Sequence, residues 1–140
     1  FEHLREGLVF VEENGPSLPF LTFFELRLLK FSGYQPILEH CRRCGKYVRD
    51  SSQTLWRFSS RDGGVLCSSC SAFRREAVPL SPGALEALAE LQKANSILPH
   101  HLSLSPALLK ESRPALLRFI QFQINKELKS ASFLEAFASD

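Results

Sequence analysis

The sequence contains no methionine, no long apolar run and little net charge. No apolar stretch reaches the ~18 residues of a membrane-spanning helix, because the most apolar one, residues 18–31, contains Glu25, Arg27 and Lys30. The first 14 residues carry five charged groups and no small-residue cleavage site, so we expect no secretory signal peptide in them. A formal charge of only +2 argues against a strongly basic nucleic-acid-binding protein, although a total conceals local asymmetry.

Catalytic signatures are missing as well. The sequence has no G-x-S-x-G nucleophile elbow, no P-loop and no glycine-rich dinucleotide fingerprint, so we expect a protein that is not an enzyme. Hydrophobic residues, in contrast, make up 44% of the 140 residues. That content excludes disorder and supports one domain that buries roughly two-thirds of its unfolded surface.

The beginning of the chain has a helical pattern. Leu4, Leu8 and Val11 are spaced three to four residues apart, which predicts an amphipathic helix over residues 1–13. This pattern is already in progress at residue 1, and no initiator methionine precedes it. We therefore expect the chain to be a fragment whose N-terminal part has been removed.

The remaining helices predict a mainly α fold, a helical bundle formed by residues 1–36 and 77–140. A second helix runs from an N-cap at Ser17 to about Ser32, and its wide apolar stripe predicts the centre of the core. Ser81 and Pro82 predict an N-cap and first turn of a third helix that ends before residue 95. Further helical segments are predicted at residues 105–109, from Pro114 to about residue 129, and from a capping box at residues 132–135. Residues 37–76 interrupt the bundle as an insertion.

All four cysteines lie in this insertion, as two C-x-x-C pairs. The pairs are Cys41 with Cys44 and Cys67 with Cys70. Residues 54–58 alternate like a strand, residues 61–64 predict a turn, and residues 65–66 begin the return of a small β-hairpin that brings the pairs together. Four thiolates at ~2.3 Å are typical of Zn²⁺, so we expect one zinc ion in a Cys₄ zinc finger.

Other chemistries remain open to four cysteines. Two disulfides would require an oxidising compartment, and an iron–sulfur cluster also takes four cysteine ligands. A single redox pair leaves the second pair without a role, and the H-x-E and P-C-x-x-C sequences of zinc deaminases are absent. A closed shell of four thiolates has no open position for water, so the expected zinc is structural.

Basic residues are concentrated in the same insertion. Residues 41–75 contain eight Lys and Arg against two Asp, a net charge of +6, whereas the rest of the chain carries −4. These residues either offset the negative charge of a zinc–thiolate site or bind phosphate, which arginine pairs with bidentately. For the second interpretation, the candidate DNA-binding residues are Arg42, Arg43, Lys46, Arg57, Arg74 and Arg75.

Aromatic residues alternate with these charges. They are Tyr47, Trp56, Phe58 and Phe73. Such residues either stack on the bases of a single strand or form the small core of a hairpin, and the sequence leaves both interpretations open.

Several short motifs follow one another in a specific order. They are Phe24-Glu25-Leu26, Gly33-Tyr34 with Pro36, Cys41-x-x-Cys44-Gly45, Cys67-x-x-Cys70 and Leu128-Lys129-Ser130. In this order, over residues 18–137, they resemble the bacterial DNA-repair and recombination mediators of the RecO family.

That resemblance implies an N-terminal OB-fold, which this chain would lack, followed by a helical domain with a treble-clef-like zinc module. It also implies binding to single-stranded DNA, to RecR and to the C-terminal tail of single-strand-binding protein, with strand annealing and RecA loading at the bacterial nucleoid in the cytoplasm. For the protein tail, a groove between the second and fifth predicted helices offers Arg27, Lys30 and Arg118 as candidates. The alternatives are a zinc-stabilised protein-interaction scaffold without DNA contact and a GTPase-activating module with a related finger.

Overall fold

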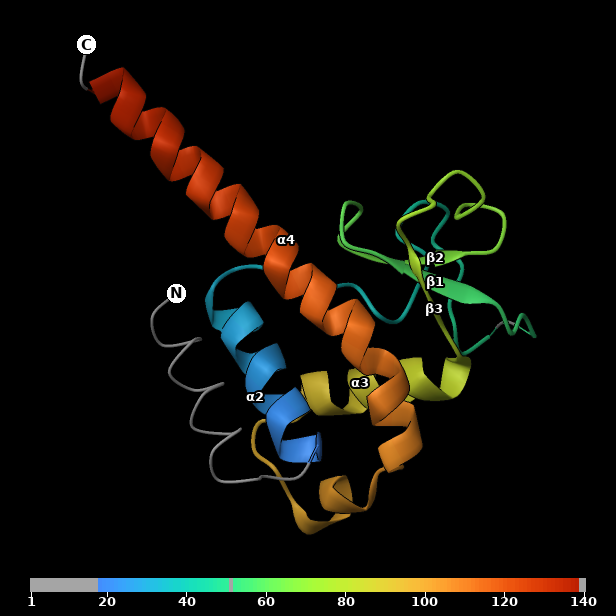
Figure 1. Cartoon of the computed structure of the whole chain (residues 1–140). Coiled ribbons are helices and arrows are strands. Elements are labelled where there is room, and N and C mark those ends of the chain that lie inside the picture. Colours follow the sequence, from blue (N-terminus) through green and yellow to red (C-terminus); the bar gives the residue numbers. More distant parts are fainter. Residues whose placement is uncertain (1–17, 51, 139–140) are drawn as a thin grey trace.

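Helices make up most of the regular structure in the computed structural model, which describes residues 18–50 and 52–138. Within these ranges lie the helices α2 (Leu18–Phe31), α3 (Pro82–Lys93) and α4 (Pro106–Ala138), with a short 3-10 helix η1 (Pro99–Ser103) before α4. Strands β1 (Trp56–Ser59), β2 (Gly64–Cys67) and β3 (Val78–Leu80) form an antiparallel sheet in the order β2-β1-β3. The mainly α architecture with a small hairpin is confirmed (Figure 1).

Helix α2 begins and ends close to the predicted positions. Gly33 follows it in the left-handed conformation, with a φ of 82° that favours glycine. The Tyr34 N–H donates to the Leu29 carbonyl at 2.8 Å, as in a Schellman motif. Phe31 is 75% exposed, so the wide apolar stripe of α2 is only partly covered, although Leu26 and Leu29 are buried in the core. The prediction that the core is centred on α2 is thus met only in part.

The core is instead shared by the helices and the sheet. Helix α4 packs against α2, α3, β1 and β3, and Figure 1 shows it passing α2 and the sheet before it projects beyond them. Phe58 of β1 meets Phe119 of α4 edge to face, with 5.5 Å between ring centroids. Trp56 and Leu91 are completely buried in the same cluster. The sheet that carries the cysteines is thus fixed to the helices by apolar packing.

Helix α4 corrects the predictions for the last third of the chain. Residues 105–109, Pro114 and Ser132 were expected to start separate helices, but one helix runs continuously over Pro106–Ala138. Pro114 cannot donate a hydrogen bond to the Lys110 carbonyl. Both residues are exposed, so water can satisfy that carbonyl and the helix tolerates the proline.

Strand β3 was not predicted: residues 77–80 were counted with the helical bundle, whose third helix was expected to begin at Ser81. Its central residue, Pro79, lies opposite Arg57 on an edge of the sheet, where a missing N–H breaks no interior ladder. The strand leads directly into α3, whose predicted N-cap is confirmed because the Ser81 hydroxyl accepts a hydrogen bond from the Ala84 N–H at 3.2 Å. The boundaries of the predicted insertion, residues 37–76, stay a prediction.

The predicted helix over residues 1–13 and the predicted N-cap at Ser17 lie outside the described residues. A search of the described helices for a membrane span finds none that is both long enough and apolar enough. The described residues form the helices, the sheet and the loops between α2 and β3, and the cysteines lie in this last region.

Candidate metal centre

The two cysteine pairs lie together in space. The sulfur atoms of Cys41, Cys44, Cys67 and Cys70 are all within 4.8 Å of one another. Cys44 Sγ and Cys67 Sγ are 3.7 Å apart. A tetrahedron with ~2.3 Å Zn–S bonds has edges of about 3.8 Å, whereas a disulfide needs ~2.05 Å. The donor set and its spacing therefore fit a four-thiolate metal site.

Backbone pairing with β2 positions the first cysteine pair. Ile37 forms a parallel bridge with Gly64, and its carbonyl accepts a hydrogen bond from the Val65 N–H at 3.0 Å. A Cβ atom on Gly64 would lie 2.5 Å from the Ile37 carbonyl oxygen, so this approach requires glycine. The Arg42 N–H then donates to the Val65 carbonyl at 2.8 Å. These contacts hold Cys41 against the strand that ends at Cys67.

The hairpin and one ion pair position the second cysteine pair. Trp56 on β1 lies opposite Cys67 on β2. At the hairpin turn, the Asp62 carboxylate accepts hydrogen bonds from the Ser59 hydroxyl and from Arg74 Nε, each at 2.8 Å. Burial opposes ionisation of Asp62, but these two partners lower its pKa below the ordinary value. Arg74 therefore ties the segment after the second pair to the turn.

The thiols differ in acidity. Burial disfavours the Cys41 thiolate, yet backbone hydrogen bonds, including one from the Cys67 N–H to Cys41 Sγ at 3.4 Å, lower the pKa of Cys41 to about 6. Burial and hydrogen bonds with the other thiols raise the pKa of Cys70 to about 12. A divalent cation that binds all four sulfurs must therefore displace protons.

The predicted DNA-binding residues surround this cluster unequally. Arg42, Arg43, Lys46 and Arg75 are exposed, whereas Arg57 and Arg74 are half-buried. Arg74 is occupied by its ion pair with Asp62. The charge of Arg43 also helps to lower the pKa of Asp62. The exposed members are free of any ion pair among the described residues.

The four aromatic residues of the insertion divide into two kinds. Trp56 and Phe58 are buried, which agrees with the interpretation as core residues. Tyr47 and Phe73 are exposed, and the Tyr47 ring lies 5.5 Å from that of His40 beside the first cysteine pair. Only these two exposed rings remain available for contact with another molecule.

Comparison with known proteins identifies the chain. The family model described as "Recombination protein O C terminal" matches residues 1–132. The chain belongs to the RecO family. This match confirms the resemblance to the RecO family that the sequence motifs indicate.

Curated RecO proteins align over most of this chain. The "DNA repair protein RecO" of Anaeromyxobacter sp. (strain K) is 32% identical over 135 residues, 96% of this chain and 52% of that protein. That of Symbiobacterium thermophilum is 36% identical over 121 residues, 86% of this chain and 47% of that protein. That of Desulforamulus reducens is 31% identical over 121 residues, 86% of this chain and 46% of that protein. The chain spans about half the length of these relatives, and no solved structure matches it.

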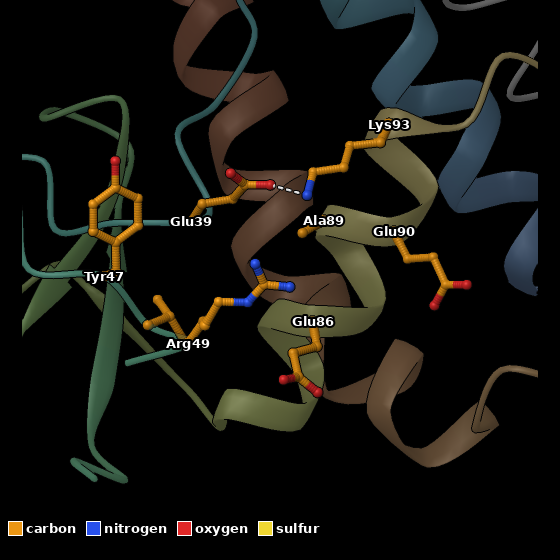
Figure 2. Close-up of a pocket in the computed structure, with 8 residues that line it drawn as sticks. Glu39, Tyr47, Arg49, Glu86, Ala89, Glu90 and Lys93 are labelled. Carbon is orange, nitrogen blue, oxygen red and sulfur yellow. Dashed lines mark ion pairs between the residues drawn. The ribbon is translucent and has the colours of Figure 1, made fainter. Parts of the chain in front are cut away.

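A groove of about 390 Å³ lies between α3 and the cysteine-bearing insertion of this RecO chain, residues 37–76, which we call the cysteine module. Figure 2 shows the Arg49 guanidinium pointing into it, between the carboxylates of Glu39 and Glu86. Lys93 forms an ion pair with Glu39 across the groove. The Glu90 carboxylate points away from the groove and lies 3.8 Å from His100, so Glu39 and Glu86 face Arg49 and Lys93 there with no net charge. Arg49 is exposed, but its guanidinium lies beside these carboxylates.

The predicted partner-binding residues of the RecO chain lie at two separate places in the structure. The Arg27 guanidinium stacks 5.1 Å from the centroid of the Phe31 ring on the same helix, and Lys30 is exposed beside it. Arg118 on α4 donates to the Glu76 carbonyl at 3.4 Å, after the second cysteine pair. The structure brings Arg27 and Lys30 together on α2, whereas Arg118 contacts the cysteine module.

A second group of potential ligands in the RecO chain is not a metal site. Ligand atoms of Glu90, His100 and His101 lie within 4.8 Å of one another. However, His101 is buried and its Nδ1 accepts a hydrogen bond from the Leu98 N–H at 2.9 Å. The neutral ring then carries its proton on Nε2 and has no lone pair left for a metal. Glu90 and His100 alone are too few ligands.

Proposed function

We propose that this chain is the C-terminal, zinc-stabilised part of a RecO-type DNA-repair and recombination mediator and binds single-stranded DNA through its cysteine module. The observation that carries the proposal is the coincidence of four clustered thiols with the +6 segment. Arg42 and Arg43 lie between two of the thiols, and both side chains are exposed. Exposed guanidinium groups on a rigid support suit phosphate contacts.

Zinc is the metal that this donor set suits best. Four thiolates in a closed tetrahedral shell are typical of structural zinc, and the distances between the sulfur atoms match the edges of a zinc–thiolate tetrahedron. Zinc in this position cross-links the first cysteine pair to the hairpin. Cys41, Cys44, Cys67 and Cys70 are the proposed ligands, and the role is structural rather than catalytic.

The partner proteins come from family membership. As a RecO-type mediator, the protein would contact RecR and the C-terminal tail of single-strand-binding protein, promote strand annealing and help to load RecA, without enzymatic activity of its own. Its site of action would be the bacterial nucleoid. Arg27, Lys30 and Arg118 are the proposed contacts for the acidic tail, because each is a basic residue on α2 or α4.

A second candidate function is a protein-interaction scaffold without DNA contact. The observation that favours it is the internal use of basic charge in the module. Arg74 pairs with Asp62, and the Arg49 guanidinium lies between the carboxylates of Glu39 and Glu86. On this account the remaining arginines only offset the negative charge of the zinc–thiolate site.

Fluorescence anisotropy separates the two functions. The purified chain is titrated into labelled single-stranded oligonucleotide and, separately, into a labelled peptide with the acidic tail sequence of single-strand-binding protein. A DNA-binding module binds the oligonucleotide, and zinc analysis of the same sample gives about one ion per chain. Capture of the peptide with no binding to the oligonucleotide would establish the scaffold and reject the DNA-binding function.

A further inference from the structure

Phe73 is the most exposed large hydrophobic side chain in the part of the chain that the structure describes. It is 87% exposed, whereas Trp56 and Phe58 of the same module are buried. An isolated exposed apolar residue is common on protein surfaces and needs no explanation by itself. Phe73, however, also lies in the +6 segment, three residues after Cys70.

The backbone around Phe73 is fixed on both sides. The Arg74 N–H donates to the Ser71 carbonyl at 3.0 Å, and the Ala77 N–H donates to the Arg74 carbonyl at 3.1 Å. The Arg74 side chain is anchored to Asp62 at the hairpin turn. Phe73 follows Cys70 by only three residues, so its backbone has a defined place close to the cysteine cluster in sequence.

Positive charge flanks the ring. Arg75 is the second residue after Phe73, and its side chain is exposed and has no ion pair among the described residues. Both residues belong to the segment 41–75, whose net charge is +6. An exposed aromatic ring beside a free guanidinium group has the composition of a single-strand binding surface, in which cations follow the backbone and rings hold bases.

We infer that Phe73 is a stacking platform for one unpaired base, with Arg75 contacting a neighbouring phosphate. This inference rests on the proposed DNA-binding function and names the residue through which the chain distinguishes single-stranded from duplex DNA. Every base has a π-face that can stack on phenylalanine, so the contact is tolerant of sequence. In a duplex those faces are covered by neighbouring base pairs, and Phe73 then contributes nothing.

The test uses Phe73→Ala, Phe73→Leu and Phe73→Trp in the whole chain, titrated with single-stranded and duplex oligonucleotides at several salt concentrations. Loss of stacking lowers single-strand affinity about tenfold in Phe73→Ala and Phe73→Leu, whereas Phe73→Trp keeps it. Duplex affinity stays unchanged. The slope of log affinity against log salt also stays unchanged, because no phosphate contact is removed. Phe31→Ala, at another exposed phenylalanine, is the matched control and leaves affinity unchanged.

Several results would overturn the inference. Wild-type affinity in Phe73→Ala or in Phe73→Leu rejects stacking, as does an equal loss for duplex and single strand. Weaker capture of the tail peptide with intact DNA binding assigns Phe73 to a protein interface instead. If Arg42→Ala/Arg43→Ala weakens DNA binding but Phe73→Ala does not, only this inference fails. If the wild-type chain binds no single strand, the proposed function fails with it. Because the ring is exposed, unfolding temperatures of the variants should match that of the wild type.

Discussion

The ion pair between Glu25 on α2 and Arg113 on α4 gives the sharpest prediction about stability. Glu25 is completely buried, and both of its carboxylate oxygens accept hydrogen bonds from Arg113, with Nη2 to Oε2 at 3.0 Å. Burial raises the pKa of Glu25 more than Arg113 lowers it. Removing Arg113 leaves a buried carboxylate without its cation, the kind of change that destabilises proteins most strongly.

The magnitude follows from the proton that Glu25 can take up. Neutralising a carboxyl with an ordinary pKa of 4.5 costs about 3.4 kcal/mol at pH 7 and about 0.7 kcal/mol at pH 5. Because the pKa is already raised in the wild type, Arg113→Ala should cost somewhat less, about 2–3 kcal/mol at pH 7. A carboxyl whose pKa is raised in the folded state stabilises that state at low pH, and this stabilisation is lost as the pH rises. The destabilisation should therefore fall below about 1 kcal/mol at pH 5.

Urea unfolding followed by circular dichroism at pH 7 and pH 5 measures both values. Lys110→Ala, an exposed basic residue on the same helix, is the matched control and should change stability by less than about 0.5 kcal/mol. The double variant Glu25→Met/Arg113→Met should recover most of the loss, because it removes both buried charges. Equal destabilisation by Arg113→Ala at the two pH values, or no recovery in the double variant, would refute the reasoning.

Two further predictions concern the metal and the start of α3. Removal of the proposed zinc by a chelator should shift the emission of Trp56, the single tryptophan, to longer wavelength, because it is fully buried opposite Cys67, a proposed ligand. An unchanged spectrum after complete metal loss would contradict the structural role. Ser81→Ala should lower the free energy of unfolding by about 1–2 kcal/mol, because the hydroxyl accepts from the Ala84 N–H and donates to Glu111 at 2.9 Å. Unfolding in urea measures this change, and an unchanged midpoint would exclude a stabilising role of the cap.

Short-range signals in the sequence predict some elements well and others poorly. Helix α2 ends near residue 32 and α3 begins after Ser81 as predicted, since Gly33 and Ser81 act through backbone conformation or a hydrogen bond within a few residues. Pro114 misleads because its cost depends on whether the Lys110 carbonyl faces solvent, which only the packed structure decides. Strand β3 is three residues long and contains Pro79, and its existence depends on pairing with β1.

For the candidate site, spacing and charge carry different amounts of information. Two C-x-x-C pairs joined by a hairpin predict the clustering of four sulfurs, because the turn sequence fixes where the chain returns. The total charge of the insertion does not reveal which cations are paired. Arg74 is anchored to Asp62, and Arg49 faces the carboxylates that line the groove with α3. Those contacts join residues far apart in sequence, so composition alone cannot predict them.

The salt dependence of single-strand binding tests the central claim most directly. Each phosphate contact with a single strand contributes about 0.7 to the slope of log affinity against log salt, so Arg42→Ala/Arg43→Ala should weaken binding and reduce the slope by about 1.4. Lys126→Ala/Lys129→Ala removes the same charge from exposed positions on α4 and should leave the slope nearly unchanged. Equal changes in the two double variants, or an unchanged slope in Arg42→Ala/Arg43→Ala, would contradict DNA binding by the cysteine module.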